Sequence, residues 1–230
     1  MDIITNEKLV TRNARIGKYS SILALVILAG GMIISFTRQD LFNLSLIALI
    51  VGFFLSQMGI YYGNRWGRRP RPDELLGQAL KGLDDRFTLF NYTSPTSHLL
   101  LGPAGVWVLI PHHQRGVITY DAQKKRWHQK GGNLYLKMFA QEGLGRPDIE
   151  ISAERDAIQK YLNKVLPNET LEVQAALIFT NDQAEVQVDD APAPTLHARK
   201  LKDFVRKTTK EKPFSMDKVA LIRERLQPAG

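Results

Sequence analysis

Two long apolar runs dominate the first third of the chain. Residues 20–37 form 18 consecutive positions without a charged side chain, and residues 41–62 form another 22. At about 1.5 Å of rise per residue, helices of these lengths span roughly 27 and 33 Å, close to the ~30 Å hydrocarbon core of a bilayer. Neither run has the one-sided pattern of an amphipathic helix. Because only Arg38, Gln39 and Asp40 separate the runs, the pattern predicts a transmembrane helical hairpin.

A signal peptide followed by a buried helix is the alternative to this hairpin. A signal sequence has an apolar region of about 7–15 residues, followed by a cleavage site of small residues. Here a second apolar span follows the first almost at once, which favours the hairpin.

Basic residues flank the outer ends of both runs. Positive side chains are retained on the cytoplasmic side of a membrane, so we expect both termini in the cytoplasm and the turn at Arg38 on the opposite side. The chain is then a two-span protein of the cell inner membrane. Residues 1–72 form its tail, hairpin and stiff Pro-containing linker, and residues 73–230 form a cytoplasmic domain. The flanking basic residues are Lys8, Arg12, Arg15, Lys18, Arg65, Arg68, Arg69 and Arg71.

Shorter apolar segments follow from residue 73 onward. Helical spacing predicts helices over residues 73–83, 152–165, 196–207 and 216–226, with Ser152 and Ser215 as N-caps. Apolar or alternating runs predict strands over residues 86–92, 98–101, 106–110, 116–120, 126–129, 171–180 and 185–188. Residues 141–148, rich in glycine and proline, are expected to form a loop. The order of these elements predicts an α/β domain with a mixed sheet.

Composition excludes several kinds of chemistry. The chain has no cysteine, which rules out disulfide scaffolds, cysteine-ligated zinc, iron–sulfur clusters and thiol nucleophiles. Its net charge is +8, but residues 1–72 alone carry nine basic and three acidic residues. The membrane flanks therefore account for most of a basicity that would otherwise indicate a nucleic-acid partner.

A more specific pattern occupies residues 97–116. Ser97-His98 precedes an apolar strand, the turn Gly102-Pro103-Ala104-Gly105, a strand ending Ile110-Pro111-His112, and Gly116. This stretch resembles the core of the NERD (nuclease-related domain) family, in which an Asp-His pair, a strand, Gly-Pro-x-Gly and a strand ending Glu-x-Lys follow one another. Gly77-Gln78 resembles the Gly-Glu on the family's first helix. The resemblance covers residues 73–226 and implies a restriction-endonuclease-like mixed-sheet domain.

The resemblance also implies a PD-(D/E)xK nuclease site, but its acidic positions are replaced. In such a site carboxylates hold a divalent cation, normally Mg²⁺, and a lysine positions or activates the attacking water. The corresponding residues here are Gln78, Ser97, Ile110 and His112. No Asp or Glu lies between Arg86 and Tyr120, so shifting the alignment by one or two residues supplies none. We therefore expect a NERD-like domain that lacks the nuclease metal site and needs no cofactor.

Histidines are the remaining candidates for chemistry. His98 and His112 could approach each other across adjacent strands and, with His113, bind Zn²⁺ or transfer protons. The alternative is that His98 is a hydrogen-bonded core residue and that His112 and His113 lie in a strand-end loop.

Two basic clusters could contact anionic lipid headgroups or the phosphates of nucleic acid. The alternative is that they are simply solvated surface. The clusters consist of Lys124, Lys125 and Arg126, and of Arg199, Lys200, Lys202 and Arg206.

Three functions fit these observations. The first is a membrane-anchored, catalytically inactive NERD-like domain that binds or scaffolds a nucleic acid or a protein. The second is an active metal-dependent nuclease with an altered site that contains His98 and His112. The third is a structural domain at the membrane surface with no affinity for nucleic acid.

Overall fold

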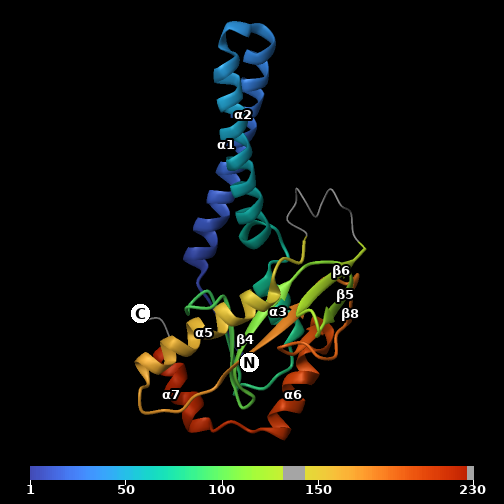
Figure 1. Ribbon diagram of the computed structural model, residues 1–230. Helices are drawn as coiled ribbons and strands as arrows, with labels where there is room; N and C mark the ends of the chain where they lie inside the picture. Colours follow the sequence, from blue (N-terminus) through green and yellow to red (C-terminus); the bar gives the residue numbers. More distant parts are fainter. Residues whose placement is uncertain (132–142, 227–230) are drawn as a thin grey trace. The chain divides into compact units, whose positions relative to one another are not determined.

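The computed structural model describes residues 1–131 and 143–226 (Figure 1). The chain divides into two compact units. Residues 7–71 form a helical unit, whereas residues 1–6 and the chain from Pro72 onward form an α/β unit.

The helical unit is a pair of long helices. Helix α1 (Glu7–Thr37) and helix α2 (Phe42–Tyr62) are joined by the 3₁₀ turn η1 (Gln39–Leu41), and the π-helical turn η2 (Gly63–Gly67) follows α2. Within the described residues, two helical stretches, one containing α1 and one containing α2, are long and apolar enough to cross a membrane. Large apolar side chains remain exposed on both helices, among them Phe36 at 82% and Phe54 at 67%. The two predicted apolar helices are therefore confirmed, and α1 begins 13 residues before the predicted span.

Glycines allow the two helices to approach closely. A Cβ atom added at Gly31 would lie 2.8 Å from the Cβ of Ala48, and one at Gly59 would lie 3.0 Å from the backbone nitrogen of Ser21. The Ser45 hydroxyl also donates a hydrogen bond of 2.9 Å to the Gly31 carbonyl. Small residues thus permit backbone-to-backbone packing along the pair.

A six-stranded mixed sheet forms the centre of the α/β unit. Its order is β1 (Asp2–Thr5), β2 (Thr88–Asn91), β3 (His98–Gly102), β4 (Gly105–His112), β7 (Val173–Phe179) and β9 (Thr195–His197). Strands β2, β3 and β4 form an antiparallel meander, while β1 runs parallel to β2, and β7 runs parallel to both β4 and β9. A second sheet has the order β6 (Arg126–Lys130), β5 (Gly116–Asp121) and β8 (Ala184–Gln187).

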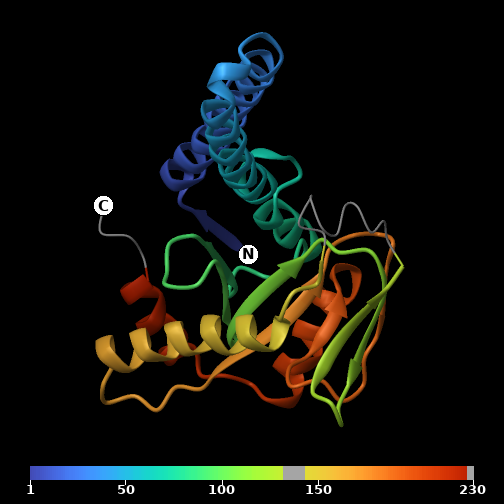
Figure 2. The ribbon, with the colours of Figure 1, turned by 45° about the horizontal axis from the view of Figure 1, so that its top comes forward.

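Helices cover both faces of the six-stranded sheet (Figure 2). Strand side chains alternate between the faces, so Val108 and Ile110 pack with α5 (Pro147–Val165) and α7 (Met216–Leu226). Trp107 and Leu109 pack on the other face with α3 (Pro72–Ala79) and α6 (Leu201–Glu211). The expected α/β architecture with a mixed sheet is therefore confirmed.

Several predicted boundaries were wrong, and the helix expected over residues 73–83 ends at Ala79. Residues 1–6, expected to be a tail, contribute β1 to the sheet. The helix expected over residues 196–207 begins only at Leu201, after β9 and the 3₁₀ turn η3 (Ala198–Lys200). Helix α5 starts at Pro147 rather than near Ser152, because proline fits the first turn of a helix and Asp148 and Glu150 favour its N-terminus. The predicted loop therefore ends before Pro147, and residues 141–142 lie outside the described residues.

Candidate functional site

The candidate site lies where β3 begins and β4 ends. Leu99 pairs with Val108 in the antiparallel register, and continuing this register by two residues places Ser97 opposite Ile110. Ile110 is 3% exposed and belongs to the apolar cluster beneath α5. Its hydrocarbon side chain fills the position where the resemblance expects a metal-binding glutamate, and it offers no ligand to a hard cation.

His112 stands where the resemblance expects a lysine, and its ring has a contact on both sides. Its Nε2 atom lies 3.0 Å from Oε2 of Glu150, and its Nδ1 atom lies 3.0 Å from Oε1 of Gln114. The Gln114 amide nitrogen donates to the Gly143 carbonyl at 3.1 Å, which fixes the amide oxygen toward His112. Both contacts can be hydrogen bonds at once only when both ring nitrogens carry hydrogen. With both ring nitrogens engaged in this way, neither is open to a metal.

Glu154 organises the start of β3. Its Oε2 atom accepts a hydrogen bond from the Thr96 hydroxyl and another, of 3.1 Å, from the backbone N–H of Ser97. Thr96 is only 2% exposed, so this carboxylate provides the buried Thr96 hydroxyl with a hydrogen-bond acceptor.

The sequence-based interpretation missed Glu150 and Glu154. They lie four residues apart on α5 and therefore project from one side of it. Glu154 also falls within the apolar stripe of Ile151 and Ile158. A charged residue inside such a stripe was the available signal for a partnered, part-buried carboxylate.

The donor set does not fit Mg²⁺, which prefers an oxygen-rich octahedral shell. At the replaced positions the chain presents an amide, a hydroxyl, a hydrocarbon and an imidazole, and the two glutamates of α5 already accept hydrogen bonds from neighbouring groups. Among the described residues, no three His, Asp or Glu side chains converge as a metal-binding group.

His98 lies apart from this cluster. Side chains alternate along β3, so His98 lies on the same face of the six-stranded sheet as Leu100, the face covered by α3 and α6. His112 contacts Glu150 of α5, which covers the opposite face. The His98 ring is 2% exposed, and its Nδ1 atom lies 2.9 Å from Oδ1 of Asn91. The structure thus brings together Ser97, Ile110 and His112, but it does not bring His98 to His112.

Gln78 also lies apart from the other replaced positions. It is exposed on α3, the helix that packs on the face opposite α5. The fourth position implied by the resemblance therefore does not join the other three.

The basic candidates have different environments. Arg199 pairs with Asp182 at 2.7 Å. Lys202 and Arg206 donate to the backbone carbonyls of Lys81 and Gly82, at 3.3 and 3.0 Å, so these two side chains tie α6 to the end of α3. Lys200 is exposed at the end of η3.

The other basic cluster forms the exposed turn between β5 and β6. Lys124, Lys125 and Arg126 are exposed there. The backbone N–H groups of Lys124 and then Gln123 donate to the Asp121 carboxylate, each at 3.0 Å, and these bonds hold the pKa of Asp121 below its usual value. The turn therefore presents its basic side chains on a fixed backbone.

Comparison of the chain with protein-family models, curated proteins and solved structures finds no match.

Proposed function

We propose that this chain is an inner-membrane protein that presents a NERD-like, catalytically inactive α/β domain to the cytoplasm as a binding or scaffolding module. The observation that carries the proposal is the replacement of the acidic and lysine positions by Gln78, Ser97, Ile110 and His112 within a retained order of elements. Helix α3, strand β3, the Gly-Pro-Ala-Gly turn, strand β4, Gly116 and the late strand β7 follow one another as the resemblance implies.

Two features of the helical unit support its role as a membrane anchor. Its apolar side chains are exposed along both helices, and water would penalise that exposure while lipid would not. In addition, β1 and the chain from Pro72 belong to the same compact unit. This shared unit supports a hairpin whose two ends emerge on the same side of the membrane, and the basic residues at both ends agree with that topology.

Single cysteines test this topology, because the natural chain has none. Ile3→Cys and Lys164→Cys should react with a membrane-impermeant maleimide only after the cells are permeabilised, whereas Gln39→Cys should react in intact spheroplasts. All three positions are exposed, and the cysteine-free chain measures the background. Labelling of Ile3→Cys and Gln39→Cys from the same side would reject the two-span anchor.

The binding role is tested with the full chain in detergent and fluorescent single- and double-stranded oligonucleotides. With Mg²⁺ or Mn²⁺ present we expect no cleavage. If nucleic acid is the ligand, anisotropy should report binding that weakens between about 50 and about 200 mM salt. It should also weaken in Lys125→Gln/Arg126→Gln but not in the matched pair Lys160→Gln/Lys164→Gln on α5, since all four side chains are exposed.

The active nuclease with an altered site is the second candidate. It is favoured by the position of Glu150 and Glu154, which bring two carboxylates to the Ser97 and His112 end of the sheet. Metal-dependent cleavage that His112→Ala abolishes and His98→Ala preserves would establish this function and overturn the inactive one.

The membrane-surface structural domain is the third candidate. It predicts neither cleavage nor binding of nucleic acid. Association of the α/β unit with anionic vesicles at the same salt concentration would then be its distinguishing property.

A further inference from the structure

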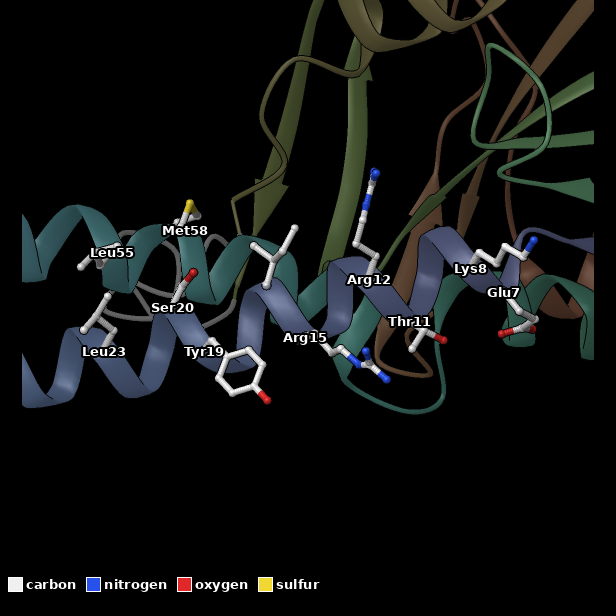
Figure 3. A pocket seen from close by; sticks show the side chains of 11 residues that line it. Glu7, Lys8, Thr11, Arg12, Arg15, Tyr19, Ser20, Leu23, Leu55 and Met58 are labelled. Atoms are coloured by element: carbon white, nitrogen blue, oxygen red, sulfur yellow. The ribbon is translucent and has the colours of Figure 1, made fainter.

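A groove of about 800 Å³ runs along α1 on the side where α2 lies beside it. Its lining changes in character along the helix (Figure 3). Lys8, Arg12 and Arg15 line one part, and Tyr19 and Leu23 line the next. Helix α2 adds Leu55 and Met58 to the apolar part.

The three basic residues lie on one side of α1. Their spacing of four and three residues brings them to neighbouring positions on the helix surface. All three are exposed, and within the described chain no ion pair or hydrogen bond engages their side chains. The groove also contains Glu7, whose carboxylate lies 3.7 Å from the Arg71 guanidinium. The basic part of the groove therefore keeps a net positive charge.

The change from basic to apolar falls at the expected surface of the bilayer. If the first span begins at Ser20, Arg15 lies about 7 Å outside the hydrocarbon core and Leu23 about 4 Å inside it, at about 1.5 Å per residue. Met58 lies about 6 Å inside the end of the second span at Tyr62 by the same measure. The headgroup layer is about 5–7 Å thick on each side. The groove thus crosses from the headgroup layer into the hydrocarbon.

We propose that this groove binds an anionic phospholipid of the cytoplasmic leaflet, an inference that rests on the membrane insertion proposed above. The lipid phosphate lies against Arg15, an acyl chain lies along Tyr19, Leu23 and Met58, and Arg12, about 12 Å outside the hydrocarbon core by the same measure, adds positive charge at the outer end of the groove. A zwitterionic lipid is disfavoured, because its ammonium group would enter a site that is already positive. An inorganic phosphate would gain the charge contact but not the apolar one.

Native mass spectrometry of the full chain, released from detergent micelles, tests the site. The probes are phosphatidylglycerol and phosphatidylcholine with identical acyl chains. We expect preferential retention of phosphatidylglycerol, and retention should fall about fivefold for each arginine removed in Arg12→Gln/Arg15→Gln. The control variant Lys18→Gln/Arg38→Gln loses the same number of positive charges at residues that do not line the groove. This variant should retain phosphatidylglycerol as the natural chain does.

A second variant tests the apolar half without changing any charge. Met58→Trp fills the groove and should reduce phosphatidylglycerol retention while Arg12 and Arg15 remain. Excess inorganic phosphate should not displace the lipid, because phosphate lacks the apolar contact. The proposal is overturned if the natural chain retains the two lipids equally, or if Arg12→Gln/Arg15→Gln retains phosphatidylglycerol as the natural chain does.

The cysteine-labelling experiment separates this inference from the proposed function. If labelling reports two spans and lipid selectivity is absent, only the lipid site is rejected. If labelling rejects the two spans, the anchor itself is rejected, and with it the basis of this inference.

Discussion

One carboxylate fixes the loop that precedes β3. Glu154 accepts hydrogen bonds from the Thr96 hydroxyl and the Ser97 N–H, and hydrogen bonds to a charged group contribute more than neutral ones. Glu154→Gln should lower the free energy of unfolding by about 1–2 kcal/mol, measured by chemical unfolding of the full chain in mild detergent. Asp156→Asn, exposed on the same helix, should change it by less than about 0.5 kcal/mol.

The turn between β5 and β6 should respond to acid through Asp121. Because the N–H groups of Lys124 and Gln123 lower its pKa in the folded chain, the carboxylate stabilises the fold above the unfolded pKa of about 3.9. That contribution is lost as the pH falls through the lower folded pKa. Asp121→Asn should therefore be less stable than the natural chain by a constant amount between pH 7 and pH 5, and the difference should shrink only below about pH 4. A difference that disappears already near pH 6 would contradict this assignment.

Individual glycines differ in what they contribute to the helix pair. A Cβ at Gly59 would lie 3.0 Å from the backbone nitrogen and 3.1 Å from the Cα of Ser21, whereas one at Gly30 would meet no atom within 4 Å. Gly59→Ala should separate α1 from α2 and destabilise the pair by about 1–3 kcal/mol. Gly30→Ala should leave stability unchanged or raise it, because alanine favours the helix. Thermal unfolding followed by far-ultraviolet circular dichroism distinguishes the two, and equal melting temperatures would show that the pair does not need this close approach.

Strong local patterns predicted most elements, and elements that depend on distant partners were missed. Strands β3, β4 and β7 are apolar runs bounded by turns, so their predicted limits lie within about two residues of the observed ones. Strand β1 has four residues and becomes a strand only because β2, more than eighty residues later, pairs with it. The candidate site follows the same rule. Ser97, Ile110 and His112 were singled out because a contiguous stretch of sequence resembles a family motif. Glu150 and Glu154 join them only through the packing of α5, which no contiguous motif shows.

At the scale of the whole molecule, the helical hairpin is an insertion into the α/β unit. The α/β unit begins with β1, is interrupted by residues 7–71, and continues from Pro72. If the hairpin spans the membrane as proposed above, the number of crossings is even, because both of its ends return to one folded sheet. The first six residues therefore link the proposed topology of the hairpin to the stability of the α/β unit.

Residues 1–6 should stabilise the α/β unit, because β1 covers one edge of its six-stranded sheet. Strand β1 pairs with β2 in parallel. The Asp2 N–H donates to the Phe87 carbonyl at 2.9 Å, and the Asn6 N–H donates to the Asn91 carbonyl at 3.0 Å. Without β1, β2 becomes an open sheet edge, which promotes aggregation. We compare residues 72–230 alone with a chain in which a flexible linker of about 10 residues replaces residues 7–71. The linked chain should be more stable by about 2–4 kcal/mol and should remain monomeric in light scattering. Ile4→Pro in the linked chain removes a strand N–H and should abolish the gain, whereas equal stability of all three chains would show that β1 contributes nothing to the fold.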